Sequence, residues 1–131
     1  MSFLAKLTIE DQEFNVLDFS FEVTQQTDSR GLASGYPNLG ALNILIESSN
    51  DLDFYAWSIN SNAAKDGKII FYKRDAMAKH KTIEFNGAVC VGYKESFNSN
   101  DSSPMKTRII IRANAIIVEN TGYVNNWARE Y

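Results

Sequence analysis

Apolar and polar residues alternate with a period of two through much of the chain, a pattern that predicts β-strands with one buried face. The clearest case, FNVLDFSFEVTQQ, points four apolar side chains to the same side: Leu17, Phe19, Phe21 and Val23. An earlier apolar segment at residues 3–9 leads into it through the polar turn EDQE. The two segments together predict a β-hairpin.

Four later segments continue the strand pattern: ALNILIE, GKIIFYKR, TIEFNGAVCVGYKESF and MKTRIIIRANAIIVE. In ALNILIE the residues predicted to be buried are Leu42, Ile44 and Ile46. The third segment is the longest, and six of its apolar residues are in phase and predicted to share one face: Ile83, Phe85, Val89, Val91, Tyr93 and Phe97.

The last of these strands is apolar on both faces. One face carries Ile109, Ile111 and Ile117, and the opposite face, in phase with two arginines, carries Ile110, Ile116 and Val118. A half-buried sheet standing alone would expose the second set, so either a helix or another subunit must cover it.

One segment, SSNDLDFYAWSINSN, breaks the alternation and predicts a single short helix over residues 51–60. Its apolar residues recur at helical spacing: Leu52, Tyr55, Ala56 and Ile59. Asn50 or Asp51 is the predicted N-cap, because short polar side chains accept the first free backbone N–H groups.

Two loops stand out between the predicted elements. Residues 27–40 form a polar, glycine-containing stretch of a length that is uncommon in compact domains unless it has a function. The shorter NSNDSSP predicts the turn between two long antiparallel strands. Many strands and one helix predict a mainly β fold, an antiparallel barrel or sandwich with one short α-helix, in a single domain over residues 1–131.

Composition adds limits on partners and compartment. The chain has 131 residues and a net charge of −3, which gives no strong field to attract nucleic acid or an anionic membrane. A single cysteine excludes an internal disulfide. No signal-peptide pattern and no apolar stretch of membrane-spanning length appear in the sequence. We therefore expect folding in the cytoplasm, and export, if any, without a cleaved leader.

The candidate chemistry is sparse. His80 and Cys90 are the only residues of their kinds, but the cysteine lies inside an apolar strand and has no cation near it in the sequence, so we expect it to be inert. Asp51 and Asp53 are explained by a helix start. The run FYKRDAMAKHK raises a nucleic-acid hypothesis, which the net acidic composition disfavours. No catalytic set, cofactor or metal site is expected.

The chain resembles a known family over nearly its full length. The segments that carry the resemblance are the opening hairpin, DFYAWSIN, GKIIFYKRDAMAKHKTIEFNGAVCVGYKESF and PMKTRIIIRANAIIV, in the family's order. They look like the Bacteroidetes branch of the type VI secretion tube protein TssD, also called Hcp. The segment 119–131 departs most from the family, and nothing is transferred to it.

The resemblance implies a β-barrel with a flanking helix and no enzymatic activity. It implies subunits that assemble as homo-hexameric rings, which stack into a hollow tube. It further implies sheath proteins that drive the tube out of the cell, a spike protein at its tip and effector cargo. Such a protein is cytoplasmic before assembly and is then delivered to the medium or to a target cell.

For the interfaces of such a tube we single out five residues. Arg30, Tyr36 and Pro37 in the 27–40 loop are predicted to bridge stacked rings, as a donor of several hydrogen bonds, an amphipathic ring and a conformational brace. Ile110 and Ile116 are predicted to contact a neighbouring subunit. The alternatives are a subunit of a phage-tail-like machine and a monomeric ligand-binding barrel.

Overall fold

The computed structural model describes residues 3–25, 27–32, 38–48, 53–60, 62–73, 78–119 and 121–124. Within these residues the chain forms β1 (Phe3–Ile9), β2 (Gln12–Ser20), β3 (Val23–Thr24), β4 (Asn38–Leu39), β5 (Leu42–Glu47), α1 (Phe54–Ser58), β6 (Lys65–Lys73), β7 (Ala78–Phe97), β8 (Met105–Arg112), β9 (Ala115–Val118) and β10 (Thr121–Val124).

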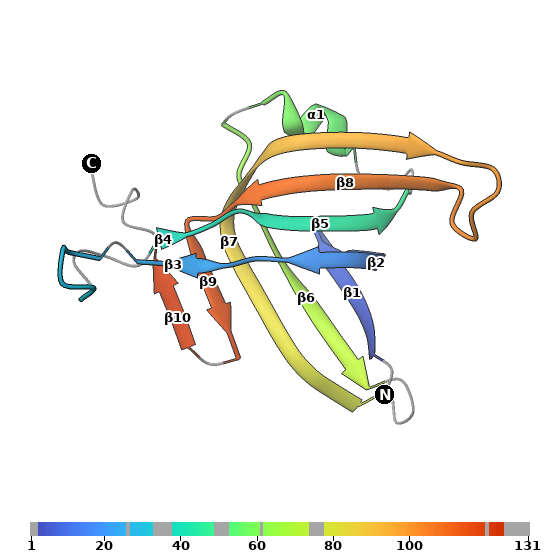
Figure 1. The fold of residues 1–131 in the computed structure, drawn as a ribbon. Helices are drawn as coiled ribbons and strands as arrows, with labels where there is room; N and C mark the ends of the chain where they lie inside the picture. Colours follow the sequence, from blue (N-terminus) through green and yellow to red (C-terminus); the bar gives the residue numbers. More distant parts are fainter. Residues whose placement is uncertain are drawn as a thin grey trace.

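Six antiparallel strands close into a barrel in the order β7-β6-β1-β2-β5-β8, and β8 pairs back with β7 (Figure 1). The long strand β7 makes closure possible because its two halves have different partners. The first half pairs with β6 and β9, and the second half pairs with β8. β9 and β10 extend the sheet beyond the barrel, and β3 and β4 form a separate two-stranded sheet. The predicted mainly β fold with one short helix is confirmed.

The hairpin predicted at the start of the chain is present as β1 and β2. Its two turn residues, Glu10 and Asp11, both have positive φ, at 53° and 64°. Two consecutive residues with positive φ match the type I′ turn, whose twist suits a two-residue connection between antiparallel strands.

The barrel interior is filled by side chains that point inward at alternate strand positions. The largest fully buried aliphatic and phenylalanine residues are Leu7, Ile9, Leu42, Ile44, Ile46, Ile69, Phe85, Ile109 and Ile111. These residues come from five strands, and Phe14 of β2 joins them, so the core is one continuous cluster. Among the described residues, no helix is long and apolar enough to cross a membrane.

The helix α1 closes the end of the barrel where β2 and β6 begin. Asp53 is the N-cap, and its carboxylate accepts a hydrogen bond from the Ala56 backbone N–H at 3.0 Å. Phe54 and Trp57 are buried, and the Phe54 ring packs edge-on against Phe14 of β2.

The buried face predicted for this helix is wrong, because Tyr55 is 57% exposed and Ile59 is 68% exposed. The two buried residues are Phe54 and Trp57, which lie three positions apart and occupy a different face of the helix from the predicted residues. The predicted caps, Asn50 and Asp51, lie outside the described residues, as does Leu52.

The single phase predicted along β7 is also wrong between residues 87 and 91. Gly87, at φ 61°, marks a β-bulge where β7 gains one residue relative to β6. Ile83 and Phe85 before the bulge are buried as predicted. After it, Cys90 is buried and Val91 is exposed, because the extra residue turns the side chains as far as Val91 to the other face.

The exposure predicted for Ile116 is wrong for a related reason. The predicted final strand is interrupted at Ala113 and Asn114, where the Asn114 backbone N–H bonds to the carbonyl oxygen of Asn86 at 2.9 Å. The interruption shifts the phase between β8 and β9, so Ile116 is only 3% exposed and belongs to the core. It therefore has no surface to offer a neighbouring subunit.

Candidate assembly surfaces

The outer face of β8 carries the second predicted interface isoleucine, Ile110. Burial alternates along β8, and Ile110 lies on the partly exposed face with Arg108, as predicted. Its side chain packs over Gly92 of β7, where an added Cβ would lie 3.1 Å from the end of the isoleucine. Arg108 donates a hydrogen bond to the Asn43 side chain and lies 3.7 Å from the Asp18 carboxylate. The result is an outer face in which an apolar side chain adjoins a charged pair.

A projection from the barrel, residues 22–40, is called the arm here. Its base is the β3–β4 pair, in which Val23 pairs with Leu39 and the Gly40 backbone N–H bonds to the Glu22 carbonyl oxygen at 2.9 Å. Figure 1 shows the arm extending away from the barrel on the side where β2 ends. Of the predicted loop at 27–40, residues 38–40 lie at this base and residues 27–32 lie in the outer part of the arm. Tyr36 and Pro37 lie outside the described residues.

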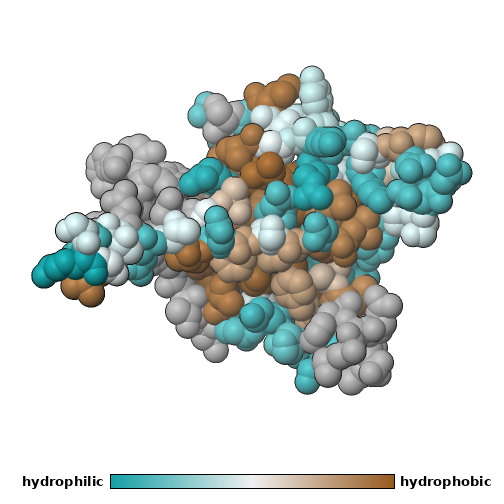
Figure 2. Space-filling view, in the orientation of Figure 1, coloured by the Kyte–Doolittle hydropathy of each residue, from teal (hydrophilic) through white to brown (hydrophobic). Residues whose placement is uncertain are grey.

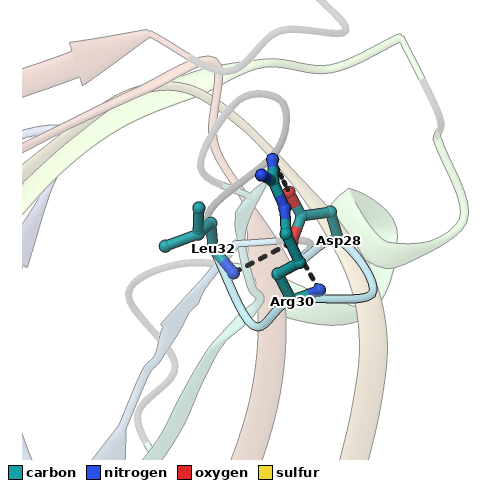
Figure 3. A network of polar contacts seen from close by, with 3 residues as sticks. All are labelled: Asp28, Arg30 and Leu32. Atoms are coloured by element: carbon teal, nitrogen blue, oxygen red, sulfur yellow. Dashed lines mark hydrogen bonds and ion pairs between the residues drawn. The ribbon is translucent and has the colours of Figure 1, made fainter.

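Residues 28–32 at the described tip of the arm form a compact turn, called the knob. The Asp28 carboxylate accepts hydrogen bonds from the backbone N–H groups of Arg30 and Leu32, at 2.9 and 3.1 Å (Figure 3). The Asp28 N–H bonds to the Leu32 carbonyl oxygen at 2.8 Å, and the Gly31 N–H bonds to the Asp28 carbonyl oxygen at 3.0 Å. The backbone bonds from Leu32 and Arg30 lower the pKa of Asp28, so the carboxylate stays ionised and holds the turn at neutral pH.

The knob determines which side chains the arm presents. Arg30 is paired at 3.5 Å with the Asp28 carboxylate, yet its side chain remains largely exposed. Leu32 is 56% exposed although it is an aliphatic residue held at both its N–H and its C=O. Sequence reasoning identified Arg30 but missed Leu32. The pattern D-x-R-x-L offered no periodic signal, and only the folded turn shows that the leucine points outward.

At the end of the barrel opposite α1 lies an open apolar groove of about 410 Å³. Its floor consists of Phe19, Phe21, Phe71 and Ile83, from β2, the residue after it, β6 and β7. The Phe19 ring lies 5.9 Å from Phe21 and 5.7 Å from Phe71, so the three rings form one cluster. In Figure 2 apolar side chains gather in the middle of the view, along and below the position of β2 in Figure 1.

Two basic side chains from the start of β7, His80 and Lys81, line the same groove and are exposed. Lys81 is paired in the sheet with Phe71, so this basic residue adjoins the aromatic floor. The run FYKRDAMAKHK, considered above as a nucleic-acid element, thus contributes both a floor residue and the basic rim. Arg74 within it lies outside the described residues.

The residues considered for chemistry are explained by packing. Cys90 is 5% exposed, and its Sγ donates to the Gly92 carbonyl oxygen at 3.1 Å. Burial raises the pKa of this thiol, which keeps it protonated and unreactive at neutral pH. His80 lies at the exposed start of the same strand, outside the core that holds the cysteine. Asp53 belongs to the helix start, as predicted, but as the N-cap itself, the role predicted for Asn50 or Asp51.

Comparison with known proteins identifies relatives across the whole chain. A family model described as "Hemolysin coregulated protein Hcp (TssD)" matches residues 1–128. No curated protein matches. Among solved structures, Hcp1 from Flavobacterium johnsoniae is 32% identical, with a TM-score of 0.85, over 93% of this chain and 99% of that one.

Two more distant structures share the fold. Hcp1 from Salmonella typhimurium is 11% identical with a TM-score of 0.71, over 88% of this chain and 85% of that one. A chain of the anti-feeding prophage baseplate is 12% identical with a TM-score of 0.53, over 91% of this chain and 93% of that one.

Proposed function

The chain belongs to the Hcp (TssD) family, and we propose that it is a structural subunit of the type VI secretion tube. The observation that carries the proposal is the family match over residues 1–128, together with the 32% identity to Flavobacterium Hcp1 at nearly complete coverage of both chains. Copies of the chain close into hexameric rings, and the rings stack into a hollow tube that sheath contraction ejects.

The partners and the cellular route follow from the same membership. The tube is surrounded by sheath proteins, tipped by a spike protein and loaded with effectors in or on it. The subunit is cytoplasmic before assembly and then leaves the cell with the tube. The protein performs no catalysis of its own, which agrees with a cysteine buried in the core and an aspartate used as a helix cap.

The packing of the barrel favours a building block over a carrier of small molecules. A ligand-binding barrel needs a hollow interior, whereas here large residues from every strand of the barrel fill the described interior. A filled barrel deforms little under load, since a close-packed core has low compressibility. Rigidity of this kind suits a tube that is pushed from one end.

The assembly surfaces divide into two roles in this proposal. The outer face with Ile110 and Arg108 belongs to the contact within the ring. The arm, with Arg30, Tyr36 and Pro37, bridges stacked rings. Such contacts are heterologous, because one surface meets a different surface on the next copy, and heterologous contacts close into rings or continue as open stacks.

Size-exclusion chromatography with light scattering tests the ring directly. The expected mass is about six times the 14.8 kDa of one chain. A sample that elutes with the mass of one copy at high concentration would exclude a ring that forms unaided.

Deleting residues 29–37 tests the role of the arm. Rings should persist, because the barrel faces are intact, but tubes imaged by electron microscopy should be lost or shortened. A deletion variant that forms tubes of normal length would remove the arm from the stacking contact.

The likeness to a chain of the anti-feeding prophage baseplate favours a second candidate, a subunit of another contractile injection machine. At 12% identity that likeness concerns the fold alone. The two candidates are separated by the genes that flank the coding sequence and by the sheath protein recovered with the native tube. Type VI sheath components support the main proposal.

A further inference from the structure

The two ends of the barrel differ in how they are closed. At one end α1 inserts Phe54 and Trp57 against the core, and the indole N–H of Trp57 bonds to the Ala63 carbonyl oxygen at 2.8 Å. At the other end the cluster of Phe19, Phe21 and Phe71 is only partly buried and lines an open groove. Within the described residues, the chain covers one end of its own core and leaves aromatic surface at the other.

The described residues of the same molecule's arm do not cover this groove. It leaves the barrel beside the groove, since Phe21 lies just before its base, and then extends outward (Figure 1). Its tip, the knob, is prefolded by the Asp28 hydrogen bonds and holds an exposed leucine. A prefolded element loses little conformational entropy on binding, so an exposed apolar side chain on it is suited to insertion.

The knob and the groove are also chemically complementary. The knob offers Leu32 with the Asp28 carboxylate bonded to its N–H and paired with the exposed Arg30, that is, an apolar group beside an ion pair whose anionic member is Asp28. The groove offers an aromatic floor with the Lys81 ammonium group at its rim, that is, an apolar pocket beside a positive charge. Opposite charges at the edge of an apolar contact set its orientation and exclude wrong partners.

We propose that the knob of one copy inserts Leu32 into the open groove of a second copy and brings Asp28 next to Lys81. The inference rests on the proposed assembly of identical subunits and specifies which surface receives the arm. Each copy supplies one knob and one groove, so the contact is heterologous, and it joins copies in successive rings, in keeping with the role proposed for the arm.

Disulfide trapping tests the contact on the full-length protein. Leu32→Cys and Lys81→Cys are made as separate variants, mixed and oxidised, and the products are separated without reducing agent. Both positions are exposed, so neither substitution removes core packing. The expected product is a covalent dimer that contains one chain of each variant. The wild type, whose sole cysteine Cys90 is buried, is the background control and should stay monomeric on the gel.

A matched control uses the closed end of the barrel. Ile59→Cys places a thiol directly after α1, at a residue even more exposed than Leu32, so it should fold and react equally well. Mixed with Leu32→Cys, it should give no covalent dimer above background. A link to residue 59 that equals or exceeds the link to residue 81 overturns the proposed contact.

A second measurement does not depend on thiol chemistry. Leu32→Asp should raise the concentration needed for half-assembly about tenfold or more, as expected for loss of one buried leucine. Ile59→Asp should leave it unchanged. Rings or tubes that form normally without a link between residues 32 and 81 contradict this contact alone. A sample that stays monomeric and unlinked at high concentration contradicts the proposed function as well.

Discussion

Replacing Trp57 by alanine tests whether α1 is an integral part of the barrel core. The indole is 2% exposed, packs against Phe54 with ring centroids 6.2 Å apart and lies under the Lys65 ammonium group, 5.9 Å from the ring centroid. Truncating a buried tryptophan costs about 3–5 kcal/mol in lost transfer free energy and cavity formation. The Ala63 carbonyl oxygen also loses its donor.

This loss is large on the scale of a domain whose total stability is about 5–15 kcal/mol. A chain of this size loses about 3–4 °C in Tm for each kcal/mol of lost stability, so we expect the substitution to lower Tm by roughly 10–20 °C. Urea unfolding followed by far-ultraviolet circular dichroism measures the change, at a protein concentration low enough that assembly does not add stability.

The matched control is Tyr55→Ala in the same helix. Tyr55 is more than half exposed and contacts only the edge of the core, with its ring 5.8 Å from Tyr93, so the expected cost is about 1 kcal/mol or less. If both substitutions cost the same, or if Trp57→Ala lowers stability by less than 1 kcal/mol, α1 does not close the barrel in the way described.

Three further predictions concern single positions. Gly67→Ala should destabilise the protein by about 1–3 kcal/mol in the same urea assay, because the new Cβ would lie 2.6 Å from the Thr8 carbonyl oxygen; unchanged stability would show that β1 and β6 are not so close. Cys90 should react with a thiol reagent far more slowly in the native protein than in the unfolded protein, and its reaction should become faster as the pH rises toward the raised pKa of the thiol. Equal rates in the native and the unfolded protein would contradict the burial of this residue. The hydrogen bond to Glu95 raises the pKa of Tyr93 to about 12, so Glu95→Gln should lower it toward 10 in an absorbance titration, with Tyr93→Phe used to assign the signal. Since the folded pKa exceeds the unfolded one, this tyrosine's contribution to stability should be complete below about pH 10 and disappear between pH 10 and 12; a contribution that grows over that range would contradict the assignment.

Strand positions were predictable from alternation because the barrel has one buried face and a continuous core. The phase within each strand was less predictable, because β-bulges do not appear in a period-two pattern. Gly87 turns the later residues of β7 to the opposite face, and a second irregularity between Cys90 and Gly92 restores the original phase, so Tyr93 packs against the core as expected. In β2 a shift after Val16 likewise leaves Leu17 exposed.

The prediction for the helix failed for a different reason, namely that tertiary contacts select among faces that are equally apolar in sequence. In α1 the pattern permitted Tyr55 and Ile59 as well as Phe54 and Trp57, and the space beside Phe14 decides for the second pair. No local signal could place Leu32, because its exposure results from hydrogen bonds within the folded turn. The assembly surfaces therefore needed the structure, whereas the family could be inferred from the sequence.

The central claim is that this barrel is a building block that is completed by copies of itself. Negative-stain electron microscopy of the purified full-length protein tests it most directly. The account predicts six-fold rings with a central hole, alone or stacked into tubes. A field of single globular particles at high protein concentration, with no rings, would contradict it.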